Sequence, residues 1–464
     1  MTATTTRRRN DAAGRFELPT LEQRYQAGKA LRAEVSRRSH AGWEPPRGRP
    51  DPVDVLIESS KGRLPNLLPI RYGRMLQSPF TFYRGAAAVM AADLARTPKT
   101  GVRVQACGDC HLLNFGGFMT PERRHIFDIN DFDETLPAPW EWDVKRLAAS
   151  FVIAGRNNRF AARDCRAAAS AAVRAYREHM AAFAVMHALD VWYARLDSAV
   201  ENLKDPEMER FYRRMLRKEA HRDAASEFAR LAHGGKGRPR IIDDPPLIYH
   251  SKQEKDPAFW PNMMRTVERY RSSLPDDRRV LFDRYQLCDV AVKVVGVGSV
   301  GTLCGVALFL ARGDDPLFLQ IKEARASVLE PYAGKSVYPN HGERVVIGQR
   351  LMQAASDIFL GWTHGDRGRN FYLRQLRDMK LKPVIEIMKP VNLVRYGGVC
   401  GWALARAHAR SGDPAVIAGY IGKRTTFDQA ITEFADAYAD QNERDHAALV
   451  AAVRAGHIAV RTDA

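Results

Sequence analysis

The chain has 464 residues, of which 45% are hydrophobic and 27% are charged, and its formal net charge is +17. This length allows roughly two to four domains with a sizeable core, and the composition is that of an ordinary globular protein. The apolar runs 294–300 and 305–311 are too short to cross a membrane, and 1–19 lacks the apolar segment of a secretory signal. We therefore expect a cytoplasmic protein without a membrane partner, in which 1–49 forms a basic, disordered tail and a leading helix.

The positive charge favours anionic ligands, but the basic residues are spread along the chain rather than gathered in one block. A solvated surface therefore explains the charge better than a nucleic-acid partner does. The cysteines are scattered, and Cys107-x-x-Cys110 is a single pair without a second pair or a histidine companion. This pattern disfavours a zinc site and fits reduced thiols that pack around a loop.

The spacing of apolar residues predicts mainly helices in the first half of the chain. The expected helices lie at 21–37, from Ser78-Pro79 to about Leu94, over 144–187 with a break near Asn157, and from about 190 to 232.

A glycine- and proline-rich segment at 233–262 then predicts a linker or loop. The character of the chain changes after it. Strands are expected over 288–322 and 370–390, and helices over 342–359 and 397–464. The whole pattern indicates an α+β protein.

The stretch 108–143 carries the residue types that nucleotide triphosphate chemistry requires. Asp109 is followed five residues later by Asn114, with His111 between them, and a strand-like run then ends at Asp131. An acid near the attacking group, together with an amide and a carboxylate on Mg²⁺, are parts of a phosphoryl-transfer site. A turn with a helix cap is the alternative explanation of the same residues.

Two acids compete for the role of metal ligand. Strand alternation places Asp131 on one face with Phe127 and Ile129, and Asp128 on the opposite face. We expect Asp131 to bind the metal, but Asp128 also lies at an acceptable distance from Asn114. The alternation does not choose between them.

A glycine-rich segment far downstream is the third motif. It contains Gly296, Gly298, Ser299 and Gly301. A dinucleotide-binding fingerprint would require a helix to follow, whereas 306–311 looks like a strand. A further strand, 317–322, ends in Lys322. Strands around a glycine-rich turn with a terminal lysine are how kinases cover ATP and hold its phosphates, and a plain hairpin with a surface lysine is the alternative.

The lysine of such a site pairs with a glutamate on the next helix. Glu330 lies eight residues after Lys322, and Glu343 lies twenty-one residues after it. The second spacing is nearer the usual one, but Glu343 falls at the very start of its helix. The sequence leaves both candidates open.

Two resemblances support the nucleotide interpretation. The loop 108–114 closely resembles the Gly-Asp-x-His-x-x-Asn loop of aminoglycoside and choline kinases. From about residue 50 onward, the chain resembles an uncharacterised bacterial domain-of-unknown-function family of the protein-kinase-like superfamily. The segments that carry this second resemblance are 78–85, 108–116, 127–134, 140–150, 296–302, 348–357 and 371–378.

The resemblance implies a kinase-like fold, a nucleotide, and roles for two further residues. Asp143, which otherwise reads as a simple helix N-cap, matches an acid that accepts backbone hydrogen bonds from the catalytic loop in small-molecule kinases. His111 is expected to support the loop. The family carries no settled substrate.

The order of the motifs departs from that of an ordinary kinase, in which the glycine-rich lobe comes first. Here the loop at 108–131 precedes the hairpin at 296–322, and 397–410 resembles the helix that normally leads into the catalytic loop. A circular permutation explains this order, and a permutation is tolerated when the original termini lie close together.

We therefore expect a two-lobed, circularly permuted, protein-kinase-like α+β fold. A helical lobe at 50–275 would carry the catalytic and metal loops, 280–390 would form the β-rich nucleotide lobe, and 391–464 would complete the helical lobe. The expected function is ATP- and Mg²⁺-dependent phosphoryl transfer to an unknown, small polar acceptor. A nucleotide-binding pseudokinase scaffold, or nucleotidyl transfer, is the alternative.

The expected roles follow the motifs. Asp109 orients or deprotonates the acceptor hydroxyl, Asn114 and Asp131 hold Mg²⁺, and Lys322 holds the α- and β-phosphates of ATP.

Overall fold

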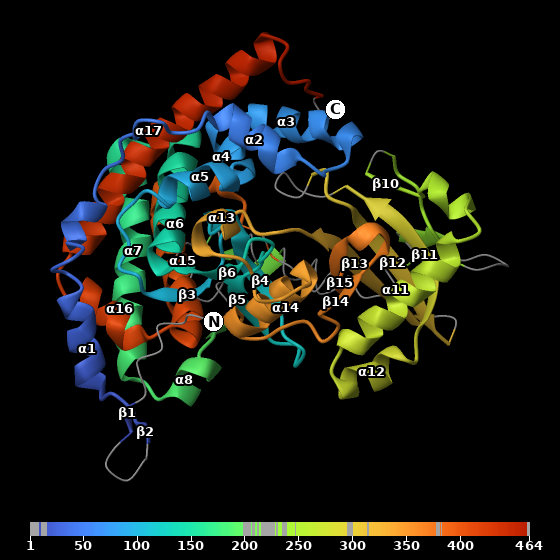
Figure 1. Cartoon of the computed structure of the whole chain (residues 1–464), viewed down its shortest axis with the longest axis horizontal. Helices are drawn as coiled ribbons and strands as arrows, with labels where there is room; N and C mark the ends of the chain where they lie inside the picture. The colour runs from blue at the N-terminus through green and yellow to red at the C-terminus, as the bar shows by residue number, and fades with distance from the viewer. Residues whose placement is uncertain are drawn as a thin grey trace.

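A six-stranded antiparallel sheet lies on one side of the molecule and a larger group of helices on the other (Figure 1). The architecture is mixed α+β, as the sequence predicts. The computed structural model describes residues 9–10, 16–197, 206, 209–210, 213–214, 228, 231–233, 239–245, 247–294, 300–312, 315–376, 381 and 383–461.

The sheet has the strand order β10-β11-β12-β13-β15-β14, and its neighbouring strands are antiparallel. Its strands are β10 (Ile248–Tyr249), β11 (Gln286–Lys293), β12 (Cys304–Ala311), β13 (Asp315–Ala324), β14 (Gly361–His364) and β15 (Asn370–Gln375). Lys322 on β13 lies between Cys304 of β12 and Tyr372 of β15. The central strand therefore carries this lysine deep into the sheet, where it is 4% exposed.

Helices cover one of the two apolar faces of the sheet. Tyr270 and Leu274 lie in or just after α11 (Phe259–Ser273), and they pack with Phe309 and Leu319 of the strands. The neighbouring helix is α12 (Asp276–Phe282). The helical lobe expected at 50–275 includes α11, whereas the apolar face of this helix packs on the sheet.

Helix α14 (His341–Met352) lies between the sheet and the helical part of the molecule (Figure 1). Asn340 caps it by accepting hydrogen bonds from the backbone of Gly342 and Glu343. The helix ends at Met352, earlier than the expected 359, because the backbone of Gln353 is extended and cannot continue the helix. A short helix, α13 (Glu330–Ala333), precedes it.

Long helices form the core of the other side. These are α6 (Trp140–Asn157), α7 (Ala162–Val185), α15 (Pro390–Ser411) and α17 (Thr426–Arg454). The expected break near Asn157 is confirmed. Helix α15 packs closely on α7 because its glycines face the backbone of that helix: a Cβ on Gly401 would overlap the oxygen of Ala172. The elements beside them are α1 (Leu21–Ala30), α8 (Ala188–Tyr193) and α16 (Pro414–Ile421).

The four short helices that follow α1 lie beside α17, towards the sheet (Figure 1). They are α2 (Pro52–Ser60), α3 (Leu68–Leu76), α4 (Pro79–Gly85) and α5 (Ala87–Leu94). Ser78 and Thr81 form a capping box, so the helix start expected at Ser78-Pro79 is confirmed. Arg49 ties α5 to α17, because its guanidinium contacts Asp93 and Asp445 at 2.8 Å each.

Short strands and turns position the loops between the two sides. Two antiparallel pairs matter most, β3 with β6 and β4 with β5. The short strands are β1 (Arg9–Asn10), β2 (Phe16–Glu17), β3 (Arg103–Ala106), β4 (Phe115–Met119), β5 (His125–Ile129), β6 (Leu136–Pro139), β7 (Leu196–Asp197), β8 (Ala232–His233) and β9 (Arg240–Ile241). The 3-10 turns are η1 (Arg37–His40), η2 (Pro65–Leu67), η3 (Leu112–Asn114), η4 (Lys252–Lys255), η6 (Asp366–Gly368) and η7 (Ile385–Ile387).

Two expectations for the middle of the chain have different outcomes. The expected linker at 233–262 contains β9, β10 and η4 in its described part. Most of the helix expected at 190–232 lies outside the described residues. In the part of the chain that the structure describes, no helix combines the length and the apolar content needed to cross a membrane.

Candidate functional site

Asp143 fixes the loop that follows β3. Its carboxylate accepts hydrogen bonds from the backbone nitrogens of Cys107 at 2.6 Å and Gly108 at 3.0 Å. His408 of α15 holds the same carboxylate at 3.2 Å. Gly108 has a φ of +84°, and a Cβ there would overlap the backbone of Glu134, so the turn requires glycine. The loop is therefore held from α6, α15 and the segment after β5.

Asp109 is presented by this turn and held by Arg146 of α6. The Nε atom of Arg146 donates to Oδ1 of Asp109 at 2.8 Å, and its Nη2 atom also contacts that oxygen. Burial opposes the charge of Arg146, but Asp109 and other neighbours outweigh it and raise the pKa of the guanidinium. The side chain of Asp109 is 20% exposed, so it stays accessible.

His111 and Asn114 lock the rest of the loop. Burial lowers the pKa of His111 to about 3, so the ring is neutral, and its Nδ1 atom accepts from the backbone of Leu113 at 3.2 Å. The amide nitrogen of Asn114 donates to the backbone oxygen of Asp109 at 2.6 Å. The backbone oxygen of Asn114 accepts from Asn130 at 2.7 Å, which places Asn114 beside the chain that leads into Asp131.

The loop after β5 carries Asp131 and Asp133, and we call it the acid loop. Lys322 connects this loop to the sheet. Its Nζ atom lies 2.7 Å from Oδ2 of Asp133 and 3.8 Å from Oδ2 of Asp131. The hydroxyl of Tyr372 donates to the other oxygen of Asp133 at 2.6 Å. Burial opposes ionisation of Asp133, but Lys322 and Tyr372 outweigh it and lower the pKa of that carboxyl to about 2. Both Asp131 and Asp133 therefore belong to one charged cluster with Lys322.

Asp128 has a different environment. It is 1% exposed and forms an ion pair with the fully buried Arg406 of α15. It also accepts from the backbone nitrogens of Ala354 at 2.8 Å and Ile129 at 2.9 Å. The structure thus commits Asp128 to joining β5, α14 and α15, because alternation along β5 points it away from Asp131. The expectation that Asp128 could replace Asp131 as the metal ligand does not fit this geometry.

Neither candidate glutamate pairs with Lys322. Glu330 lies 3.8 Å from His341, and Glu343 sits in the first turn of α14. The side chain that α14 sends towards the acid loop is Arg344, whose Nη2 atom donates to the backbone oxygen of Asp133 at 2.7 Å. The acids that face Lys322 come from the loop after β5 instead of from the helix.

The glycine-rich segment is described only at its end. Gly296, Gly298 and Ser299 lie outside the described residues. Gly301 has a φ of +90°, and its backbone oxygen accepts from Leu64 at 2.6 Å. The side chain of Arg63 donates to the backbone oxygen of Val300 at 2.7 Å. The end of this segment is therefore attached to the helical side of the molecule.

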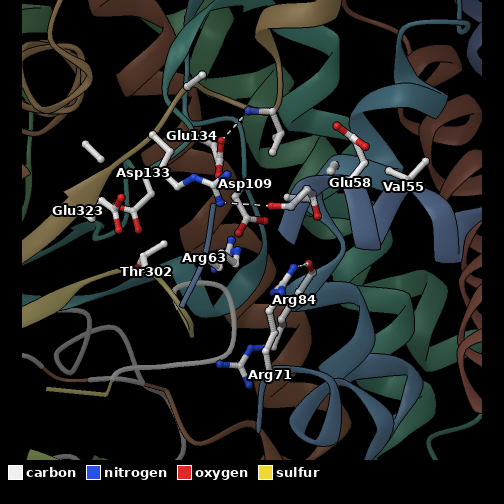
Figure 2. A pocket seen from close by; sticks show the side chains of 18 of the residues that line it. Val55, Glu58, Arg63, Arg71, Arg84, Asp109, Asp133, Glu134, Thr302 and Glu323 are labelled. Atoms are coloured by element: carbon white, nitrogen blue, oxygen red, sulfur yellow. Dashed lines mark hydrogen bonds between the residues drawn. The ribbon is translucent and has the colours of Figure 1, made fainter. Parts of the chain in front are cut away.

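A cavity of about 520 Å³ lies where these parts meet (Figure 2). It brings Asp109 and Asp131 together with Thr302, which follows the glycine-rich segment. Its charged lining residues are Glu58, Arg63, Arg71, Arg84, Asp109, Asp131, Asp133, Glu134, Glu323 and Arg325. The arginines are residues that the sequence reasoning missed. Three of them lie in or beside α3 and α4, where helical spacing gives no sign of a site.

The oxygen atoms near Asp131 suit a hard cation. The described residues contain no group of three His, Cys, Asp or Glu side chains arranged to hold a metal. Mg²⁺, however, keeps several waters and takes only one or two protein carboxylates plus the phosphates of a substrate. The carboxylate of Asp131, which lines the cavity, fits that requirement. Cys107 and Cys110 are buried free thiols, which agrees with their expected packing role.

The fold and the site define an α+β protein with an acid- and arginine-lined cavity between a sheet and a helical assembly. The chain belongs to the bacterial family DUF2252, described as an uncharacterized protein conserved in bacteria, which matches residues 63–452. The expected membership of a bacterial family of unknown function is thereby confirmed. No curated protein and no solved structure matches the chain.

Proposed function

We propose that this protein is an ATP- and Mg²⁺-dependent phosphotransferase with a circularly permuted, kinase-like fold. The observation that carries the proposal is the ion pair of 2.7 Å between Lys322 of the sheet and Asp133 of the loop after β5. The two residues lie 189 positions apart, and Asp133 lines the same cavity as Asp109, which places Lys322 directly behind that lining. A lysine on a strand, an acid loop and a loop with Asp and Asn five residues apart are the parts that kinases combine.

The nucleotide would lie between Lys322 and Asp131. Lys322 would bind the phosphates, and Asp131 with Asn114 would hold Mg²⁺, which neutralises charge on the phosphates. Thr302, which follows the glycine-rich segment, lines the same cavity. In general, backbone nitrogens of a glycine-rich turn can approach phosphate oxygens closely. The position of α14 after the lysine strand also supports a kinase-like arrangement of this lobe.

Asp109 would position the acceptor hydroxyl. Its Oδ1 atom already accepts a hydrogen bond from Nε of Arg146 at 2.8 Å, which fixes the orientation of the carboxylate. Phosphoryl transfer through a loose transition state requires positioning more than strong base catalysis. Oriented in this way, Asp109 can still accept a hydrogen bond from the acceptor.

The ion pair between Asp109 and Arg146 favours a second candidate, a nucleotide-binding scaffold without transfer. In that case Arg146 would neutralise Asp109 and leave binding intact. Nucleotidyl transfer uses the same metal and phosphate contacts, and analysis of the released product, ADP or pyrophosphate, distinguishes it from phosphoryl transfer.

Calorimetric titration of ATP with Mg²⁺ tests the site. We expect magnesium-dependent binding to the wild-type protein, weakened on the order of tenfold or more in Lys322→Ala and in Asp131→Asn. Lys335→Ala, which removes an exposed lysine, is the matched control and should bind as the wild type does. Unchanged binding in both site variants, or no binding to the wild type, would overturn the proposal.

A further inference from the structure

One wall of the cavity is made of arginines. Arg63, Arg71 and Arg84 come from the helical side, and Arg325 follows β13. Figure 2 shows the first three grouped together, with Asp109 between them and Asp133 in that view. Arg71 is 2% exposed, although arginine rarely occurs so deeply buried without a specific reason. We call these four residues the arginine wall.

Three members of the arginine wall, Arg63, Arg71 and Arg325, repel one another. Burial and the neighbouring charges of Arg63 and Arg325 lower the pKa of Arg71 to about 9. Burial and Arg325 likewise lower the pKa of Arg63. Gathering like charges in a place of low polarity costs free energy, and an anion bound there would recover it. The arginine wall therefore favours the binding of a negatively charged group.

Three acids of the cavity already pair with cations behind the lining, so the acids offset this charge only in part. Asp109 pairs with Arg146, Asp133 with Lys322, and Glu323 with Arg369 at 3.2 Å. These contacts leave the positive side of the cavity to the arginine wall.

Arg84 is the member most available to a ligand. It forms no ion pair with any described residue, and its buried Nε atom has no hydrogen-bond partner among them. The charge of Asp109 acts on it more strongly than that of any other acid, so its guanidinium lies in the field of that carboxylate. A planar guanidinium with free donors is suited to binding a phosphate or carboxylate through two hydrogen bonds.

We propose that the acceptor of this site is an anionic molecule, whose phosphate or carboxylate group is bound by Arg63, Arg71 and Arg84. This inference rests on the proposed function and adds the chemical class of the acceptor. With its anionic group on the arginine wall, the acceptor would extend towards Asp109, which would receive its hydroxyl. The phosphates of ATP would lie apart from this wall, at Lys322 and Asp131.

The test is calorimetric titration of inorganic phosphate into the full-length protein, with and without a saturating non-hydrolysable ATP analogue and Mg²⁺. We expect phosphate to bind under both conditions, and Arg84→Gln to weaken its binding on the order of tenfold. The same variant should bind the nucleotide with unchanged affinity. Arg47→Gln, which removes an exposed arginine, is the matched control and should leave both affinities unchanged.

The outcomes separate this inference from the proposed function. Phosphate that competes with the nucleotide, with both weakened in Arg84→Gln, would assign the arginine wall to ATP and overturn the inference. Nucleotide binding without any phosphate binding would also overturn it, while the proposed function stands. Phosphate binding without nucleotide binding would overturn the proposed function, and with it the assignment of the anion as an acceptor. If Arg84→Gln fails to fold, Arg84→Lys keeps the charge but loses the paired donors, and an unchanged phosphate affinity in that variant would contradict the role of the guanidinium.

Discussion

Lys322 and Asp133 form an ion pair of 2.7 Å that joins the central strand of the sheet to the loop after β5. Lys322 is 4% exposed, and Tyr372 on the adjacent strand holds the second oxygen of Asp133. The contact thus joins two sides of the molecule that are built from distant parts of the chain. Its strength depends on both groups being charged.

Asp133→Asn should lower the free energy of unfolding at pH 7 by about 1–3 kcal/mol, because Lys322 loses its nearest counter-charge. The pKa of Asp133 is lowered from 3.8 to about 2 in the folded protein. Its stabilising contribution is therefore present above pH 3.8 and is lost as the pH falls towards 2. Chemical denaturation of both proteins between pH 7 and pH 3 should show the difference shrinking with acidity. A difference that is the same at every pH would contradict this assignment.

Asp109→Asn should separate binding from turnover. The amide keeps the size of the side chain but loses the charge that orients a hydroxyl, so production of ADP should fall on the order of 10²–10⁴-fold. Affinity for ATP with Mg²⁺ should stay within about twofold, because Asp109 does not bind the phosphates in the proposed arrangement. Asp277→Asn, at an exposed site on α12, is the control. Full activity in Asp109→Asn would exclude the proposed role.

Asp143→Ala should destabilise the fold and disturb the loop. The change leaves the backbone nitrogens of Cys107 and Gly108 without their acceptor in a buried place, at a cost of about 2–4 kcal/mol. Asp143→Asn retains one acceptor oxygen and should lose less. Urea denaturation measures both variants. Equal stability of the alanine variant and the wild type would show that these hydrogen bonds contribute little.

Gly401→Ala should push α15 away from α7. A Cβ at this position overlaps the backbone oxygen of Ala172, so the variant should lose about 1–3 kcal/mol of stability. Gly398→Ala on the same helix is the matched control, because a Cβ there has no atom within 4 Å. That variant should be neutral or more stable by up to about 1 kcal/mol, through the better helix propensity of alanine. Similar thermal unfolding of the two variants would contradict the proposed close packing.

Local signals in the sequence predicted much of the fold. The helix start at Ser78-Pro79 and the break at Asn157 are predicted correctly, because each carries a signal in the residues directly beside it. The end of α14 was set too late, and the strands within 233–262 were missed, because short elements depend on partners elsewhere in the sheet.

The site was predictable only where one short stretch contains its parts. The strand pattern around 127–131 could not decide between Asp128 and Asp131, because the deciding partner, Arg406, lies 278 positions away from Asp128. The same limit applies to Lys322, for which spacing suggested a glutamate on the next helix. Arg71 and Arg84 could not be predicted as site residues. In the sequence of an amphipathic helix, an arginine that faces a cavity has the same spacing as one that faces solvent.

The attachment of Arg63 to Val300, and of Leu64 to Gly301, has a consequence for how two ligands influence each other's affinity. Arg63 belongs to the arginine wall, while Val300 and Gly301 end the glycine-rich segment. A shift of Val300 or Gly301 when a nucleotide binds would therefore act on Arg63 through these hydrogen bonds. Occupation of one part of the cavity would then change the affinity of the other, and thermodynamic linkage requires this influence to be equal in both directions.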